Sequence, residues 1–500
     1  MYKNALIIFL LVSLSVLRTA AQEMNGYVHS NYSGITGAQI NPTSIVNSKL
    51  YFDLNIIGVH INVDNDYIYL SKDDYKFSRF LSPNAEFPKN PENGNVYYDF
   101  YNEKLKNAFT QVKVLGPAIM FAKNDKAFGF STSVRNIVSG IDIPYEIAKF
   151  GAEGFDYTPL HRIRFTDNKD FRVGALSFAE LSATYAQVIY KQNRNHLTAG
   201  VTLKGLIGFG GAFLSVDNAD YMLPNSDTLI LYNANAKAGV SIPLDYTTGD
   251  SRFGDPLVLG SGLGFDLGLT YQLKMKGHTN KRYIACEQPF EDYYYKLGVS
   301  LLDIGYVKFS KNTRQLTMEN AQGTWHDFSQ QNIETIDVLF GAISSNFGSD
   351  STDMVDDEMF KVFLPSAASI QFDVRINNRM YVNSSLVVPL LMNEYTIARP
   401  SQLSVTPRLE QDNFELAIPI TLYNFKDPRI GLSARFSKFI IGTDKLGSFF
   451  GLSHFTGMDL YFMVKLPLIK GHCLRRDRGV NCGNMEFRQY QRNQERLKVD

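Results

Sequence analysis

Four glycines within residues 260–274, GSGLGFDLGLTYQLK, give this stretch the composition of a phosphate-binding loop. Such loops bind phosphate because the backbone N–H groups of a glycine-rich turn at the start of a helix point at the phosphate oxygens. The spacing of Gly262, Gly264 and Gly268 differs from the dinucleotide-binding fingerprint. Apolar residues also continue at every second position, through the glycines to Leu273. This alternation favours a β-strand that contains glycines over a nucleotide site.

A run of acidic residues could bind a divalent cation through carboxylate oxygens. Its members are Asp350, Asp353, Asp356, Asp357 and Glu358. The spacing does not match an EF-hand loop, and acidic runs of this kind are typical of solvated loops. The sequence has no G-x-S-x-G, H-E-x-x-H or Walker motif. We therefore expect no enzymatic activity, no cofactor and no metal.

The chain has three cysteines, too few for a disulfide-stabilised scaffold. Cys473 and Cys482 close a short loop and could form a disulfide in an oxidising compartment, leaving Cys286 unpaired.

From Leu50 onward, the dominant pattern is an alternation of apolar and polar residues. In residues 369–377, SIQFDVRIN, the apolar side chains share one face and the polar ones the other. Strict alternation predicts β-strands with different surroundings on their two sides. We expect strands at 50–63, 112–122, 126–138, 175–190, 196–209, 213–223, 228–243, 261–273, 292–309, 365–376, 379–390, 400–410, 413–425, 428–437, 438–443 and 457–468. The phase changes near Ile57 and Gly58, which predicts a bulge in the first strand.

The connections between these strands alternate between short polar turns and long loops. The turns include 123–126 and 191–195, and the long loops include 64–111 and 311–364, with a helix expected near 330–343. Such segregation is typical of a membrane barrel. Because open sheet edges cannot face lipid, the strands must close. The sequence therefore predicts an all-β fold, a transmembrane antiparallel β-barrel of about 14–16 strands at residues 50–468.

Composition and the chain ends agree with an extracytoplasmic protein. Residues 1–21 resemble a signal peptide, with Lys3 before the apolar run Ala5–Val16. No later stretch reaches the ~20 apolar residues of a transmembrane helix. Fifty basic and fifty acidic side chains cancel, which argues against nucleic-acid binding. The basic tail, 469–500, is expected outside the barrel, in the periplasm.

Several stretches carry a family resemblance. They include NPT at 41–43, AFGFSTSVRN at 127–136, LSFAELSATYAQVIY at 176–190, GFDLGLTYQL at 264–273, YKLGVSLLDIGYVKFSKN at 295–312 and LPSAASIQFDV at 364–374. In this order they resemble a family of uncharacterised outer-membrane barrels of the Bacteroidota. That family is similar in architecture to long-chain fatty-acid transporter-like barrels. The resemblance implies an outer-membrane location, and a lumen plug formed by residues 22–49, but no activity.

The polar faces of the predicted strands supply the candidate site residues, which should point into the barrel. They are Asp53, Asn55, Glu180, Lys204, Asp266, Lys274, Gln371, Asp373 and Arg375. Such residues could form interior ion pairs that satisfy one another, or they could line a polar conduit.

Three functions remain open at this stage. The chain could be a passive channel or transporter for a small hydrophobic solute, a proposal that rests on architecture. It could instead be a non-transporting scaffold or surface component of an envelope or secretion complex, with a protein partner. It could also be a secreted soluble β-protein.

Overall fold

The computed structural model describes residues 23–73, 96–100, 102, 104–167, 170–249, 257–279, 290–328, 333–348, 354–393 and 395–469. The predicted signal peptide, the tail beyond residue 469 and all three cysteines, including the Cys473–Cys482 pair, lie outside these ranges.

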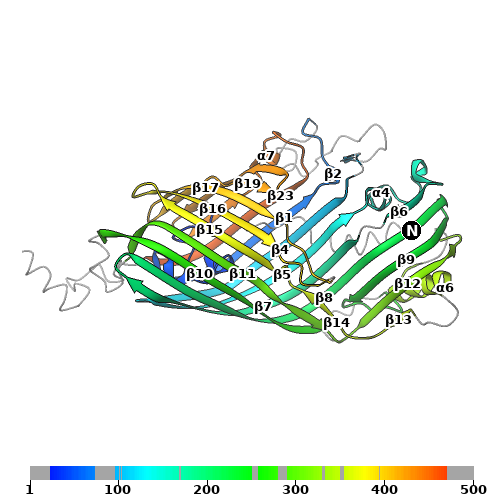
Figure 1. Cartoon of the computed structure of the whole chain (residues 1–500), viewed down its shortest axis with the longest axis horizontal. Helices are drawn as coiled ribbons and strands as arrows, with labels where there is room; N and C mark the ends of the chain where they lie inside the picture. The colour runs from blue at the N-terminus through cyan, green and yellow to red at the C-terminus, as the bar shows by residue number, and fades with distance from the viewer. Residues whose placement is uncertain are drawn as a thin grey trace, which may run out of the picture.

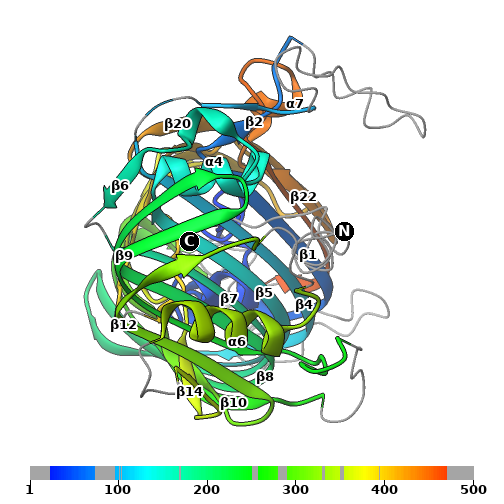
Figure 2. The same cartoon turned by 90° about the vertical axis from the view of Figure 1, so that its right-hand side faces the viewer.

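The strands form a closed antiparallel barrel, as the alternating sequence predicts (Figures 1 and 2). The ring closes where β1 pairs with both β4 and β23. Its 14 positions are β1 (Leu50–Asn65), β4 (Lys106–Lys123), β5 (Lys126–Ile143), β7 (Phe171–Gln192), β8 (Asn195–Asn225), β10 (Gly260–Thr279), β11 (Glu291–Phe309), β15 (Ala367–Arg375), β16 (Met380–Pro389), β17 (Gln402–Glu410), β18 with β19 (Phe414–Ala417, Ile420–Tyr423), β20 with β21 (Asp427–Ile430, Leu432–Phe436), β22 (Phe439–Thr443) and β23 (Gly457–Ile469).

The two ends of the barrel differ. One end, which we call the turn end, carries tight hairpins such as those joining β4 to β5 and β7 to β8. The opposite end, the loop end, carries most of the long connections. These contain the short elements β2 (Ile68–Tyr69), β3 (Tyr98–Asp99), α4 (Tyr145–Glu153), η2 (Thr158–Leu160), β6 (Arg164–Asp167), β14 (Phe360–Phe363) and α7 (Leu446–Phe449). No helix among the described residues is long and apolar enough to cross a membrane.

The prediction of two strands at 196–209 and 213–223 is wrong, because β8 is one continuous strand of 31 residues. The sequence suggested a break at the glycines 210 and 211. In the structure these glycines make room for an aromatic ring, since a Cβ at Gly211 would lie 2.6 Å from Cζ of Phe309. Glycine here permits close packing and does not end the strand.

The long connection predicted at 311–364 is also wrong in part, because it contains a strand. β12 (Thr313–Trp325) pairs with β9 (Thr228–Ser241), and β9 pairs with the loop-end half of β8. α6 (Ile336–Phe347) lies along this projecting sheet (Figure 2), and β13 (Val355–Asp356) pairs with β12. The buried side chain of Trp325 lies in the apolar cluster that these elements form. The helix expected near 330–343 begins later, after Thr335, whose side chain accepts from the Val338 N–H.

The strand that carries the glycine-rich stretch shows how the two faces are used. Leu263, Leu267 and Leu269 are 75%, 43% and 45% exposed on the outside of β10, whereas Asp266 is 2% exposed. The predicted bulge in β1 is confirmed, since the register with β23 shifts between Asn55 and Ile57. A barrel of this size is too wide to be filled by wall side chains alone, so other residues must fill its lumen.

Candidate functional site

Residues 23–49, which we call the lumen segment, lie inside the barrel (Figure 2). The segment contains a short 3-10 helix, η1 (Gly34–Gln39), and one turn of helix, α2 (Ser44–Asn47). All of its residues are buried except Glu23, Gln39, Ser44 and Asn47, which are half-buried. The lumen segment therefore occupies the interior of the barrel toward the turn end.

Charged side chains of the wall hold the lumen segment at several points. Lys465 donates to the Ser33 carbonyl at 2.6 Å and pairs with Asp53 at 2.7 Å. Glu410 receives Lys49 at 3.0 Å and the side-chain amide of Asn31 at 3.0 Å. These contacts are hydrogen bonds to charged groups, the stronger class of such bonds.

Two apolar clusters also join the lumen segment to the wall. One packs Ile35 and Ile45 against Met120, and the other packs Val28 and Ile40 among wall residues. The interface with the wall is therefore mixed, with polar anchors between apolar contacts.

Three wall glycines form a recess for the turn at residues 41–43, and we call them the glycine recess: Gly200 on β8, Gly268 on β10 and Gly298 on β11. A Cβ on Gly268 would lie 2.9 Å from Pro42, and one on Gly200 would lie 2.9 Å from the backbone of residues 42 and 43. Beside the glycine recess, the hydroxyls of Thr43 and Thr270 are in contact at 2.5 Å. Gly268 therefore admits the lumen segment, which gives one glycine of the opening stretch a structural role.

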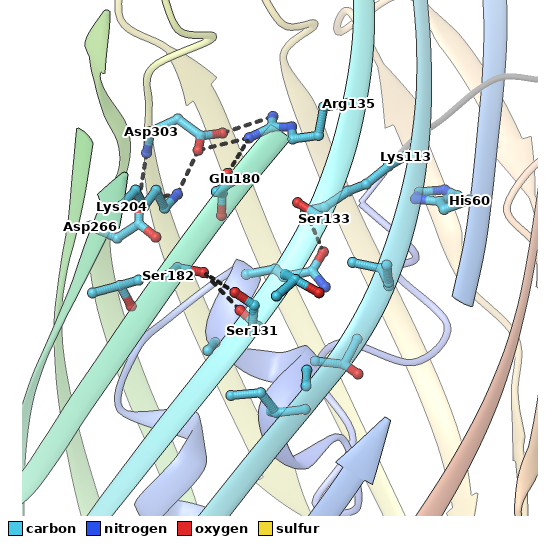
Figure 3. A pocket seen from close by; sticks show the side chains of 18 of the residues that line it. His60, Lys113, Ser131, Ser133, Arg135, Glu180, Ser182, Lys204, Asp266 and Asp303 are labelled. Atoms are coloured by element: carbon cyan, nitrogen blue, oxygen red, sulfur yellow. Dashed lines mark hydrogen bonds and ion pairs between the residues drawn. The ribbon is translucent and has the colours of Figure 1, made fainter. Parts of the chain in front are cut away.

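A cluster of charges centred on Asp303 lies inside the barrel, and Figure 3 shows Arg135, Glu180, Lys204 and Asp266 gathered around it. Arg135 donates two hydrogen bonds to the Asp303 carboxylate, at 3.0 and 3.1 Å. Lys204 reaches the same carboxylate at 2.6 Å and Arg399 at 3.1 Å. Arg399 also pairs with Glu23 at 3.1 Å. Arg399 lies in the loop between β16 and β17, at the loop end of the barrel. The cluster therefore joins this loop to the lumen segment.

The structure buries the nine predicted site residues inside the barrel, with Arg375 only partly exposed. Three of them meet at the Asp303 cluster: Lys204 pairs with Asp266 at 2.7 Å, and Glu180 pairs with Arg135 at 3.4 Å. Five other predicted site residues lie away from this cluster, and each makes its own contact. The contacts are Asp373 with Arg408 at 2.9 Å, Arg375 with Asp292 at 2.8 Å, Lys274 with the Glu291 carbonyl at 2.9 Å, Gln371 with Asn41 at 3.0 Å, and Asn55 with the Gly116 carbonyl at 2.9 Å.

Sequence reasoning missed Arg135, Asp303 and Arg399. Arg135 lies on the polar face of an alternating strand, so its pattern could have identified it. Asp303 lies at a bulge with φ of 53°, where the alternation changes phase. Arg399 lies in a loop, where no periodicity applies. The centre of the site therefore had only a weak signal in the sequence.

A cavity of about 60 Å³ lies between the lumen segment and β1, β4, β5, β7 and β8, next to the Asp303 cluster. Its lining is mostly polar. Lys113 reaches into it and donates to Gln39 of the lumen segment at 2.9 Å. Within the described residues, no carboxylate pairs with Lys113, and the Asn55 Oδ1 and Ser133 Oγ atoms have no hydrogen-bond partner. The space suits a few water molecules or a small polar group.

Toward the loop end the lumen is apolar. A buried cluster there includes Phe109, Phe178, Phe213, Phe309 and Phe360. The interior therefore changes along its axis, from an aromatic layer at the loop end, through the Asp303 cluster and the polar cavity, to the lumen segment.

His29 of the lumen segment should make its seating sensitive to acid. Burial, with the nearby Arg408 and Lys296, lowers the pKa of His29 to about 3. When the segment is displaced into water, the side chain regains an ordinary pKa near 6.5. Stability of the seated form is thus full above about pH 6.5 and falls as the pH drops, by about 2 kcal/mol at pH 5.

We expect protease cleavage within residues 23–49 of the purified barrel to increase between pH 7.5 and pH 5. The variant His29→Gln should lose most of this dependence, because glutamine does not titrate. Equal pH dependence in both proteins would show that another group controls the seating.

Among the described residues, no group of three His, Cys, Asp or Glu side chains could hold a metal ion. No curated protein matches the sequence. A Pseudomonas aeruginosa FadL homologue has 11% identity and a TM-score of 0.41, with 91% of this chain and 99% of that chain covered. The toluene transporter TodX of P. putida has 10% identity and a TM-score of 0.33, with coverage of 87% and 92%.

The Escherichia coli outer-membrane protease OmpT has 7% identity and a TM-score of 0.19, with 83% of this chain and 95% of that chain covered. None of these likenesses is close enough to transfer a function. A family assignment comes from the sequence itself, over residues 42–444, which include most of the barrel and the Asp303 cluster. The chain belongs to the family of unknown function DUF5723.

Proposed function

We propose that this protein is an outer-membrane transport barrel for a small hydrophobic solute, and that the lumen segment must move for the solute to pass. The observation that carries the proposal is a wide barrel whose lumen holds its own residues 23–49 through a partly polar interface. No chemical reaction is part of the proposed activity.

The outer surface of the wall supports a membrane location. Its strands present large apolar side chains to the outside around the barrel. Exposed examples are Ile119, Phe130, Leu181, Leu203, Leu263, Val299, Ile370, Phe372, Leu403, Ile420, Leu432, Ile441 and Phe462. An apolar surface of this extent is unfavourable for a monomer in water, whereas the lipid-facing side of a membrane barrel has such a surface.

An arginine on this surface should therefore be costly only if the surface faces lipid. Leu267 lies midway along the apolar face of β10, so Leu267→Arg should destabilise the barrel by about 2–4 kcal/mol in lipid. Urea unfolding in vesicles, followed by tryptophan fluorescence or gel migration, measures the change. The control is Val338→Arg, at a 47% exposed valine on α6, outside the barrel. Similar small effects for both variants would place the protein in water.

Polar anchoring supports movement of the lumen segment. The charged groups that bind it, including Glu410 and Lys465, can exchange these contacts for water when the lumen is hydrated. An interface made only of apolar contacts would lose far more free energy on wetting, since each buried apolar Å² is worth about 25 cal/mol. The aromatic layer at the loop end supports a solute with hydrophobic character, because it presents rings such as Phe213 and Phe360 to the interior.

Uptake into proteoliposomes tests the proposal. The full barrel and a variant lacking residues 23–49 are reconstituted, and entry of a small aromatic hydrocarbon and of a small sugar is followed. We expect slow hydrocarbon entry through the full barrel and faster entry of both probes without the lumen segment. Absence of flux in both proteins, with correct folding shown by heat-modifiable gel migration, would favour the scaffold alternative.

A further inference from the structure

Two lysines on the outer surface lie directly opposite each other on neighbouring strands. Lys308 of β11 pairs in register with Lys361 of β14, at the loop end of the barrel (Figure 1). Both lysine side chains are exposed. The residue next to each lysine on its own strand, Val307 on β11 and Val362 on β14, is fully buried. The two ammonium groups therefore leave the same outer face of the wall.

Like charges at directly opposed positions of an antiparallel pair repel each other, because their Cβ atoms are only about 4.5–5.5 Å apart. Ion pairs relieve such repulsion elsewhere in this protein. Here, within the described residues, neither lysine has a carboxylate within ion-pair distance. The acidic residues nearest in sequence do not serve the pair. Asp303 binds Lys204 inside the barrel, and Asp357 binds Arg314. Asp356 accepts from Gln315 and from the backbone of Glu358. In the part of the chain that the structure describes, Glu358, three residues before Lys361, makes no ion pair with either lysine. The pair thus has the charge of an anion site without a protein anion.

The position of the pair along the wall indicates which anion it meets. One row toward the middle of the barrel, Tyr306 and Phe363 are paired on the same outer face, with ring centroids 5.7 Å apart. Lys361 lies over the Tyr306 ring at 4.5 Å. On β10, Leu263 of the same row is 75% exposed. A row of apolar and aromatic side chains bordered by exposed lysines is typical of a membrane–water interface, where lipid headgroups lie.

We propose that Lys308 and Lys361 form a binding site for the phosphate of a lipid headgroup, with the acyl chains of that lipid along Leu263 and Tyr306. A phosphate monoester can accept hydrogen bonds from both ammonium groups and neutralise their repulsion. Ser261, which pairs with Lys308 from the other side and is exposed, adds a hydroxyl donor to the site. The inference rests on the membrane location proposed above and does not depend on transport or on the lumen segment.

Native mass spectrometry of the purified full chain tests the site. The protein is released from mixed micelles that contain either phosphatidic acid, which carries a phosphate monoester, or phosphatidylcholine. The wild-type chain should retain one phosphatidic acid molecule, and the double variant Lys308→Gln/Lys361→Gln should bind it more than about tenfold more weakly, since each lysine near a charged headgroup contributes about 1 kcal/mol. Neither protein should retain phosphatidylcholine in a defined number.

A second lysine pair provides the control. Lys123 and Lys126 are also paired across strands, at the turn end, but Asp125 lies in the turn between them. Lys123→Gln/Lys126→Gln should leave the retained lipid unchanged. In phosphatidylcholine micelles, the Lys308→Gln/Lys361→Gln variant should be about as stable to heat as the wild-type chain, because the repulsion that it loses offsets the lost contact between Lys361 and the Tyr306 ring. Equal phosphatidic acid binding by that variant would overturn the proposal. So would complete displacement of the lipid by millimolar inorganic phosphate, which would indicate a site for the free ion.

Discussion

Replacing Asp303 by asparagine is expected to destabilise the barrel by about 3–5 kcal/mol. The Asp303 carboxylate accepts from Arg135, Lys204 and Arg399, all of them buried. Asparagine has nearly the same shape but no charge, so it would leave these cations without their shared anion. Each cation would keep one other carboxylate, from Glu180, Asp266 or Glu23. The three would nevertheless lose the anion that they share, and breaking buried ion pairs is strongly destabilising. Urea unfolding in vesicles, or the temperature of the heat-modifiable gel shift, measures the loss.

The matched control for this variant is Asp220→Asn. Asp220 accepts two hydrogen bonds from Arg164, at 2.7 and 2.6 Å, a geometry as good as that of the Asp303 contacts. Its side chain and that of Arg164 are, however, 24% and 52% exposed. The expected cost is therefore at most about 1 kcal/mol. Equal effects of the two variants would mean that the lumen is hydrated enough to screen its charges.

Fixing the lumen segment to the wall is expected to reduce solute flux by at least about tenfold, if displacement of the segment opens the path. The Thr43 and Thr270 hydroxyls are 2.5 Å apart, so Thr43→Cys/Thr270→Cys places two sulfur atoms at the segment and the wall in bonding range. The variant is built in a chain whose Cys286, Cys473 and Cys482 are replaced by serine. Flux into proteoliposomes should be lost on oxidation and return on reduction.

A disulfide within the wall is the control for this lock. Ser385 and Ser404 face each other across β16 and β17, with hydroxyls 2.7 Å apart and both side chains buried. Ser385→Cys/Ser404→Cys should form a similar bond without attaching the lumen segment, and flux should not change with redox state. Undiminished flux through the oxidised Thr43→Cys/Thr270→Cys protein would show that the path does not require movement at residue 43.

The sequence predicted the strands of the wall well, because alternate residues of a strand face opposite sides and so differ in polarity. Leu267 and its neighbour Asp266 illustrate this, since they lie on the outer and inner faces as the period of two requires. The same logic failed where a glycine accommodates a distant ring, as Gly211 does for Phe309. That contact depends on which strand lies next to β8, which the local sequence does not encode.

The candidate site was only partly predictable for a related reason. Alternation identifies Glu180, Lys204 and Asp266 as inward-facing, but it cannot say which charges meet across the lumen. Their common partner Asp303 lies at a bulge, and Arg399 reaches the cluster from a loop. Both positions escape a periodic pattern, because backbone irregularity places them.

The glycine recess also limits how the family can vary. Gly200 and Gly268 leave no room for even one methyl group while the turn at residues 41–43 is in place, and a Cβ at Gly298 would meet the Gln371 side chain and then Asn41, at 3.0 Å. A relative with larger residues at these three wall positions must have lost that turn or moved it. In an alignment of relatives, the residues at these three wall positions would therefore indicate whether a barrel can hold such a turn. Small residues in the wall are the sign of a segment in the lumen, even where that segment itself has changed.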